Sequence, residues 1–272
     1  AVKVSGIRLR NSRLAHNADG IDVTSCNNVI IDNCDIRCGD DALAIVGYDH
    51  HFEIPGFHHL RHESGNILIS NCNLQSASSG IRIGFLDQNS VKNIHVSNVN
   101  ITNSTRGIGI FVRDQCSLEN ITFDNISIET KLRTGDWWGN GEPIHLSAVR
   151  GKDNVKLGQI KHVIFSNIIC KGENGMLIYG SDESIIEDVS FNHIRFELTD
   201  SKLNDVAGGN IDLRGASIQK QLFKNDIPGL FIQYANDVRI NDFELTWSDT
   251  RMPYFTNGIE AHHFEDLNVS SF

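Results

Sequence analysis

Several features are scarce in this sequence of 272 residues. It has only 4 prolines, which is typical of chains whose backbone N–H groups mostly donate within sheets. No run of 18 apolar residues occurs, so we expect no membrane-spanning helix and no membrane partner. Positive charge is also scarce, since 24 Lys and Arg stand against 34 Asp and Glu, a net charge of −10. Because no basic face is available to neutralise phosphate, we expect no nucleic-acid partner.

Cysteine is too infrequent to suggest a disulfide framework, with 6 residues in the chain. Cys34 and Cys72 occupy a position that holds Val99 and Ile126 in other repeats. We therefore predict buried thiols in place of aliphatic side chains, with a disulfide as the alternative.

A phrase of alternating apolar residues around an inner Asn recurs along the chain. Asn71, Asn98 and Asn125 follow one another at intervals of 27 residues, and we expect their side chains to form a ladder. A fixed period of this length indicates a solenoid of stacked coils. Short strands with inward Val, Ile and Leu predict an all-β, right-handed parallel β-helix of about nine coils, forming a single domain over residues 1–272.

The first coil has no cap in the sequence. Residues 2–11 already read as a coil strand, with no amphipathic helix before them and no leader peptide. Since the ends of solenoids need a cap, we expect either that N-terminal coils are missing or that another copy of the chain covers this end as a homo-oligomer.

A second phrase, a small residue followed by alternation, predicts one outward-facing strand set with two parallel rows. One row consists of Asp22, Ala44, Arg82, Gly109 and His145, and the other of Asp19, Asp41, Ser79, Arg106 and Glu142. Successive members of a row should lie about 4.8 Å apart. Two insertions, 47–63 and 131–141, interrupt the period beside these rows, and loops on a rigid scaffold commonly carry binding specificity.

The first insertion is rich in histidine, with His50, His51, His58, His59 and His62. These side chains are zinc ligands by type but lack a recognisable ligand spacing. We predict a cleft wall or a subunit contact there, with no metal and no cofactor.

Three carboxylates gather in the phrases NADGID (17–22) and GDDALA (39–44). Asp19 and Asp41 fall in one row on adjacent coils, and Asp40 precedes Asp41. Carboxylates this close cannot all ionise freely, so at least one pKa should rise and place an acid beside a base. Hydrolysis of a glycosidic bond needs such a pair. A calcium site and a solvated acidic turn are the alternatives.

With these motifs the sequence resembles the polygalacturonases, family 28 of the glycoside hydrolases. That family carries Asn-Thr-Asp-Gly, then Gly-Asp-Asp-Cys, Gly-His-Gly and Arg-Ile-Lys on a right-handed parallel β-helix. The resemblance implies that Asp40 is the general acid, that Asp19 and Asp41 activate water, and that Asn17 orients the cluster. It also implies inversion at the anomeric carbon, for which carboxyl groups about 6.5–9.5 Å apart are expected.

The sequence departs from that family at the substrate positions. Ser79 replaces the His of Gly-His-Gly, and Gly109 and Phe111 replace the Arg and Lys that hold a uronate carboxylate in the family. We expect galacturonate to fit the cleavage subsite poorly. Arg82 and Arg106 flank the vacated positions and are predicted to bind a substrate anion instead, or alternatively to neutralise the nearby aspartates.

Further substrate contacts are predicted around the same rows. Trp137 and Trp138 are expected to stack on a sugar ring, or alternatively to pack within their own loop. Glu142 and His145 lie one coil beyond Arg106, so we expect both to face the cleft, His145 bonding a sugar hydroxyl or standing in for the lost His. Asp22, in the outer row, completes the predicted substrate-binding set.

These observations favour an inverting glycoside hydrolase acting on a polysaccharide or oligosaccharide of pectin type or a related glycan. The alternatives are a non-catalytic carbohydrate-binding or assembly β-helix and, less favoured, a polysaccharide lyase or epimerase. We expect a secreted or periplasmic protein, with a cytoplasmic location as the alternative.

Overall fold

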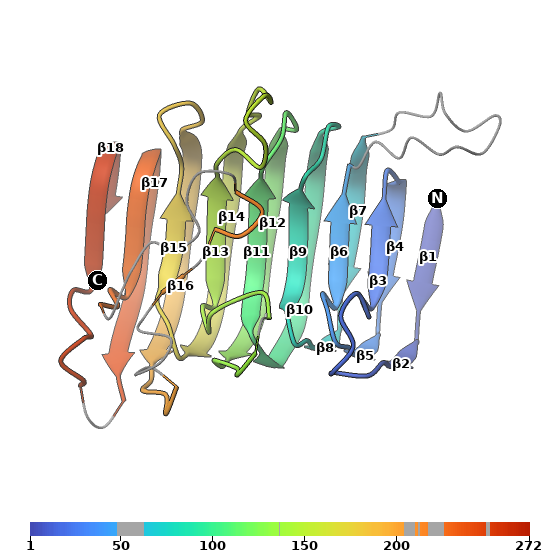
Figure 1. Cartoon of the computed structure of the whole chain (residues 1–272), viewed down its shortest axis with the longest axis horizontal. Helices are drawn as coiled ribbons and strands as arrows, with labels where there is room; N and C mark the ends of the chain where they lie inside the picture. The colour runs from blue at the N-terminus through green and yellow to red at the C-terminus, as the bar shows by residue number, and fades with distance from the viewer. Residues whose placement is uncertain (48–62, 136, 204–209, 212, 217–225, 249–250) are drawn as a thin grey trace.

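Parallel strands stacked along one axis make up the computed structural model (Figure 1). It describes residues 1–47, 63–135, 137–203, 210–211, 213–216, 226–248 and 251–272. The His-rich stretch of the first insertion therefore lies outside the described residues. Within the described residues there is no helix that could cross a membrane.

The coils present three strand sets, which we call the back, side and cleft sheets. The back sheet contains β1 (Val2–Ser5), β4 (Asn27–Asp32), β7 (Ser64–Ser70), β10 (Val91–Ser104), β12 (Leu118–Thr130), β14 (Ile160–Gly172), β16 (Ile186–Leu198), β17 (Leu230–Trp247) and β18 (Ile259–Val269). The side sheet begins with β2 (Arg8–Arg10), β5 (Asp35–Arg37) and β8 (Asn73–Gln75) and continues in the last residues of β10, β12, β14, β16 and β17. The cleft sheet contains β3 (Ile21–Thr24), β6 (Leu43–Val46), β9 (Ser79–Phe85), β11 (Arg106–Val112), β13 (Ile144–Ala148), β15 (Met176–Tyr179) and the first residues of β17 and β18. The nine back-sheet strands agree with the predicted number of coils.

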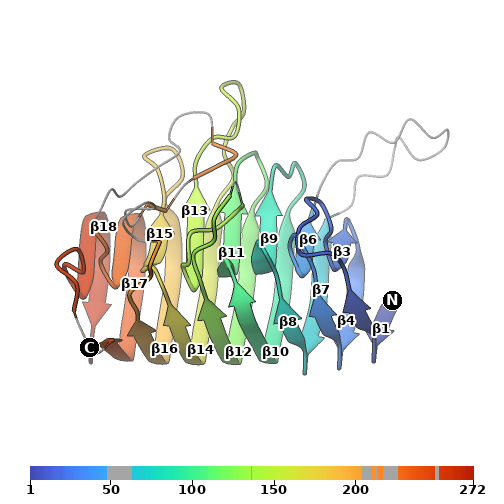
Figure 2. The ribbon, with the colours of Figure 1, turned by 60° about the horizontal axis from the view of Figure 1, so that its bottom comes forward.

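The register between coils follows the sequence period. Ile67 pairs with Ile94, and Ile94 with Ile121, each one period apart. Val189 pairs with Val238, which reveals a third insertion between the back-sheet parts of β16 and β17 that the sequence analysis missed. Figure 2 shows the strands of successive coils stacked along one axis, and their inward side chains form one buried cluster from Val23 to Phe255.

Each coil turns its corners at residues with positive φ, a conformation that Asn and Asp tolerate better than most residues. One corner row runs through Asn28, Asn66, Asn93, Asn120, His162, Asp188, Asp237 and Asp266, and the other through Asn33, Asn71, Asn98, Asn125, Asn167, His193 and Asp242. The predicted Asn ladder forms where Asn125 Nδ2 donates to Asn98 Oδ1 (2.7 Å) and Asn98 Nδ2 to Asn71 Oδ1 (3.4 Å). Asn71 instead donates to Asp32, and Asn167 to Asp124, so carboxylates replace amides at both ends of that ladder.

The core consists of inward side chains that repeat on successive coils. The rings of Phe123 and Phe165 stack at 5.1 Å between centroids, and those of Phe165 and Phe191 at 5.1 Å. Cys34 and Cys72 are buried free thiols, as predicted. At the N-terminal end of the stack, Val2 and Ile7 are exposed; that a further coil, a cap or a second copy covers this end stays a prediction.

Truncating the central ring of the phenylalanine stack tests this register. Phe165 is fully buried, whereas the next-door Ile164 points outward and is 41% exposed. Phe165→Ala should lower the free energy of unfolding by about 3–5 kcal/mol, because it leaves a cavity in the stack. Ile164→Ala should change it by about 0.5 kcal/mol or less. Urea unfolding followed by circular dichroism measures both changes. A larger loss of stability in Ile164→Ala than in Phe165→Ala would contradict the register.

Candidate functional site

The cleft sheet presents the two predicted rows on its outer face. Asp22 pairs with Ala44, Ala44 with Arg82, Arg82 with Gly109 and Gly109 with His145, so these residues stand side by side on successive coils. A pocket opens over these rows. It is lined by Asn17, Asp19, Asp40, Asp41, Ser78, Arg82, Phe85, Arg106, Phe111, Arg113, Trp138, His145 and Arg214. Of the predicted site residues, Asp22, Ser79, Trp137 and Glu142 do not line it.

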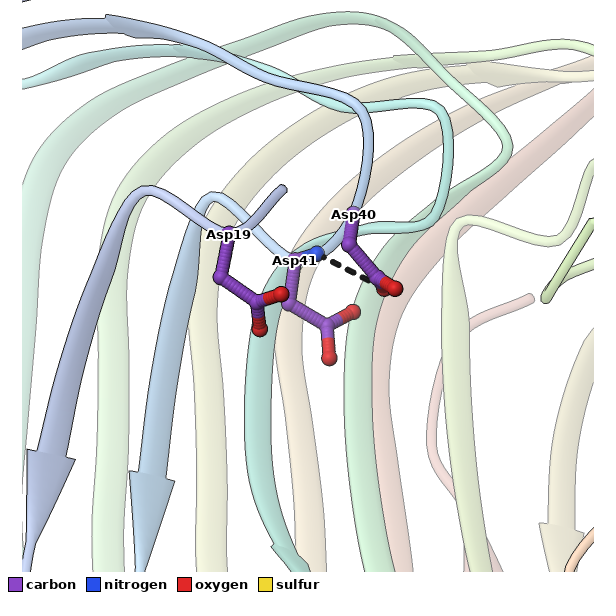
Figure 3. Close-up of side chains that lie close together, drawn as sticks. All are labelled: Asp19, Asp40 and Asp41. Carbon is purple, nitrogen blue, oxygen red and sulfur yellow. Dashed lines mark hydrogen bonds between the residues drawn. The ribbon is translucent and has the colours of Figure 1, made fainter. Parts of the chain in front are cut away.

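Three carboxylates converge at one end of the pocket. One oxygen each of Asp19, Asp40 and Asp41 lies within 4.8 Å of the others, and Figure 3 shows the side chains converging on one space from adjacent coils. These closest oxygens lie nearer than the separation expected between the carboxyl groups of an inverting pair. The three oxygens are also hard ligands of the kind that calcium prefers.

Two glycines let the acidic segments approach their neighbours. A Cβ on Gly39 would lie 2.3 Å from the carbonyl oxygens of both Ser12 and Ala15, and one on Gly20 would lie 2.2 Å from the carbonyl oxygen of Ala42. Any other residue would push apart the backbone segments that carry Asp19 and Asp40. This close packing explains the glycine in each acidic phrase.

Asp41 is held as an anion. Its Oδ1 accepts hydrogen bonds from Ser78 Oγ (2.9 Å) and Ser79 N (3.0 Å), and its Oδ2 forms an ion pair with Arg82 Nε. Burial on its own would raise the pKa of this carboxyl, but the Arg82 charge and these hydrogen bonds outweigh burial and lower it. Asp41 is therefore ionised at neutral pH.

The pKa values of Asp19 and Asp40 are raised, opposite to that of Asp41. Burial, reinforced by the negative charges of Asp40 and Asp41, raises the pKa of Asp19 to about 7. Burial and then the charge of Asp41 also raise the pKa of Asp40, although its carboxylate accepts hydrogen bonds from Asn17 N and Asp41 N, each at 3.0 Å. The cluster thus holds a proton near neutral pH beside a fixed anion. Asn17 orients Asp40 through its backbone, which adopts a φ of 54°.

The two arginines predicted to clamp a substrate anion already have carboxylate partners. Arg82 pairs with Asp41 and donates from Nη1 to Gly84 O (3.1 Å). Arg106 is 4% exposed and donates from Nε to Glu142 Oε1 (2.6 Å) and from Nη1 to Ser79 Oγ (3.3 Å). These contacts favour the alternative that each arginine neutralises a carboxylate of the chain.

Glu142 does not line the pocket, contrary to the expectation that it faces the cleft, whereas His145 lines the pocket although it has no solvent-exposed surface. Both are 0% exposed. Arg106 and the Asn140 N–H of the insertion bond Glu142, and the Phe111 ring packs against His145. His145 lies 3.2 Å from Glu142 Oε1 and 3.0 Å from Ser147 Oγ, so both ring nitrogens have partners. Burial lowers the pKa of His145 to about 4, which keeps the ring neutral. Burial alone would raise the pKa of Glu142, but Arg106 and His145 lower it to about 2.

Phe111 fills the space beside Gly109. A Cβ on Gly109 would lie 2.6 Å from the Phe111 ring, so a larger residue there would displace it. The guanidinium carbons of Arg106 and Arg113 lie 4.8 and 5.2 Å from the ring centroid, and His145 meets its edge at 5.0 Å. Such cation–π contacts hold the ring in place. Extending the outward alternation along β11 would have found Arg113, which the sequence analysis missed.

The two tryptophans of the insertion have different surroundings. Trp138 lines the pocket, where its ring meets Phe85 edge-on at 5.9 Å and Arg214 lies 4.7 Å from its centroid. Trp137 stacks on His16 at 4.7 Å, outside the pocket lining. Trp138 therefore remains a candidate sugar-stacking residue, whereas Trp137 packs against the chain.

A segment of the third insertion covers the cleft sheet next to the pocket. Ile211, Leu213 and Ala216 pack on Leu177 and Phe231 of the cleft sheet. Arg214 of this segment lines the pocket. The phrase GNIDL (209–213) reads like a coil strand of the repeat, but its described residues form no strand, so the repeat misplaces this segment. Ser78, just before β9, and Phe85, its last residue, were also missed.

Comparisons with known proteins agree with this architecture. Residues 1–134, which hold both acidic phrases, match the family model described as glycosyl hydrolases family 28. A probable polygalacturonase of Arabidopsis thaliana is 31% identical over 97 residues, 30% of this chain and 21% of that protein. The resemblance to family 28 is thereby confirmed.

Two solved structures share the fold. A family 28 exopolygalacturonase of Yersinia enterocolitica superposes with a TM-score of 0.57 at 14% identity, covering 97% of this chain and 43% of that one. An exopolygalacturonase of Thermotoga maritima gives 0.54 at 21% identity, covering 72% and 42%. The right-handed parallel β-helix is confirmed, and the chain spans less than half the length of these relatives.

Carboxyl titration tests the electrostatics of the cluster without reference to activity. Asp41 should stay ionised down to a pH below the ordinary range of Asp, whereas Asp19 should take up its proton near pH 7. In Arg82→Met, Asp41 loses its cation, so its pKa should rise. Carbon-detected NMR of Asp side chains in the wild type and in this variant measures the change. Ordinary titration of all three carboxyls near pH 4 would refute the described electrostatics.

Proposed function

We propose that this chain acts as a glycoside hydrolase of family 28, the family that residues 1–134 match, and cleaves a pectin-type or related glycan with inversion. The observation that carries the proposal is the cluster of Asp19, Asp40 and Asp41, in which one carboxylate is fixed as an anion beside two that favour a proton. No metal or cofactor is part of the proposal.

In the proposed mechanism Asp40 is the general acid. Its raised pKa keeps a proton available for the glycosidic oxygen as the bond breaks. Asp19, with a pKa of about 7, is suited to accept a proton from the attacking water near neutral pH. Asp41 cannot exchange protons easily because Arg82, Ser78 and Ser79 hold it ionised; its negative charge stabilises the developing positive charge on the sugar ring and helps to orient the water.

The close approach of the three carboxylates is compatible with either stereochemical outcome. What supports inversion is that Asp41 accepts bonds on both of its oxygens, so as a nucleophile it would have to give up partners in a buried site. A water held between Asp19 and Asp41 requires no such loss. The configuration of the first product decides this point.

The alternatives differ in what happens to the glycan. A non-catalytic binding β-helix would bind it and leave it intact. A lyase would require a base with a cation against the uronate, and no lysine lines the described pocket. Arg82 and Arg106, two of the four arginines that line the pocket, also pair with carboxylates of the chain, so they are not available to neutralise a uronate.

Replacing the proposed acid tests the mechanism. Asp40→Asn should lower kcat at least about 10²-fold, because the amide cannot donate the proton, while the fold is kept. Release of reducing ends from a panel of pectic glycans measures the effect, and Asp35→Asn, on the exposed side sheet, is the matched control. Wild-type kcat/KM should fall as pH drops below about 7, since Asp19 is then protonated and cannot accept a proton from the attacking water. Full activity in Asp40→Asn would remove the hydrolase assignment, and a first product of retained configuration by proton NMR would remove inversion.

The occupied arginines and the Phe111 ring predict the charge of the sugar at the cleavage subsite. Methyl-esterified pectin should be cleaved faster than the same polymer after de-esterification, because Phe111 stands where the family holds a uronate carboxylate and the flanking Arg82 and Arg106 already pair with carboxylates of the chain. Each charged hydrogen bond forgone is worth about 1.5–3 kcal/mol, so the difference in kcat/KM should reach at least about tenfold. Phe111→Lys should reduce this difference in kcat/KM between the two polymers. Faster cleavage of the de-esterified polymer by the wild type would contradict the prediction.

A further inference from the structure

Three arginines gather beside the pocket without a carboxylate partner. Arg13 lies in the segment between β2 and β3, Arg37 ends β5, and Arg133 lies in the insertion after β12. Among the described residues, none of the three forms an ion pair, in contrast to Arg82 and Arg106 of the pocket. An unpaired basic cluster is notable in a chain with a net charge of −10.

Hydrogen bonds hold Arg13 at the centre of this cluster. Its Nη2 donates to Ser76 O (3.0 Å) and Asn103 O (2.7 Å), and its Nη1 to Gln75 Oε1 (3.4 Å). Gln75 is the register partner of Arg37 on the side sheet.

Arg133 joins the cluster from the insertion that follows β12. Lys131 N donates to the carbonyl oxygen of Ser104 (2.8 Å), the residue after Asn103, which anchors the start of the insertion beside Arg13. The three guanidinium groups are close enough to repel one another. Burial and then the charges of Arg133 and Arg37 lower the pKa of Arg13 to about 10, and burial and then Arg37 lower that of Arg133.

The cluster shares its supporting segments with the pocket. The segment that carries Arg13 continues to Asn17 and Asp19, and Asn11 Nδ2 donates to Asp19 O (2.7 Å). The insertion that carries Arg133 continues through Trp137, which stacks on His16, to Trp138 in the pocket lining. The segments that carry Arg13 and Arg133 therefore connect the cluster directly to the pocket lining.

We infer that Arg13, Arg37 and Arg133 form an anion subsite for the carboxylate of a uronic acid residue that belongs to the same glycan as the neutral residue in the pocket. This rests on the proposed function. Arginine binds carboxylates through paired N–H donors, and Arg37 is exposed and Arg133 partly exposed. The substrate is then a mixed polymer, uncharged at the cleaved residue and acidic at a nearby one.

Binding to an inactive protein tests this subsite separately from catalysis. In the Asp40→Asn background, a de-esterified galacturonate hexamer and its fully methyl-esterified counterpart are titrated by calorimetry at low salt. Arg37→Ala and Arg133→Ala should each weaken binding of the acidic hexamer at least about tenfold and leave the esterified one unchanged. The control is Arg239→Ala, which removes a positive charge from the back sheet, where Arg239 pairs with Asp188 and Asp237. It should leave both affinities unchanged.

The outcomes separate the two proposals. If both arginine variants bind the acidic hexamer as tightly as their parent, or lose the esterified hexamer equally, the subsite is overturned, whatever the wild type hydrolyses. If inorganic phosphate displaces the hexamer stoichiometrically at micromolar concentration, the cluster is a general anion site and the uronate assignment is overturned. If the arginine variants weaken acidic binding selectively while the wild type cleaves no glycan, the subsite stands and the hydrolase proposal fails.

Discussion

Coil-to-coil hydrogen bonding in a single parallel register is the constraint on which the rest of this structure depends. Each strand pairs with the corresponding strand of the next coil. A side chain that points inward on one coil therefore has an inward-pointing partner on the next, and the same holds for outward positions. This register produces the stacked phenylalanines in the core and the rows of polar residues on the outer face. The site is a local departure from this repetition, in which two neighbouring coils bring carboxylates into one place.

Charge pairing between adjacent coils then differentiates the carboxylates. Arg82, one coil beyond Asp41 in the stack, fixes Asp41 as an anion, and Arg106 does the same for Glu142. Each pair is desolvated, so its Coulomb attraction is strong, but the arginine is no longer available to a ligand. The same pairing that prepares the acid cluster therefore withdraws Arg82 and Arg106 from a ligand, whereas Arg13, Arg37 and Arg133 have no carboxylate partner among the described residues.

The periodic part of the protein could be predicted from the sequence because a solenoid repeats its environment. The 27-residue interval gave the sheet register, the two outer rows and the convergence of Asp19, Asp40 and Asp41. Exposure within those rows could not be predicted in the same way. Glu142 and His145 occupy the expected positions, but neither has exposed surface, because Arg106, Phe111 and Asn140 of an insertion with no periodicity pack around them. Arg214 belongs to another such segment, whose docking on Leu177 and Phe231 depends on tertiary packing alone.

The corner rows give the two halves of the stack different chemistry. In the N-terminal half the corners are amides, whose hydrogen bonds do not change with acidity. In the C-terminal half the same corners are His162, Asp188, His193, Asp237 and Asp242, and the hydrogen bonds from His162 and Arg239 lower the pKa of Asp188. A carboxyl with a lowered pKa stabilises the fold above its unfolded pKa, and this contribution is lost as pH falls through the folded one. The lowered pKa values of Asp32 and Asp41 act in the same way on the N-terminal coils, so acid removes stabilising charges from both halves of the stack, at its corners and at the aspartate cluster.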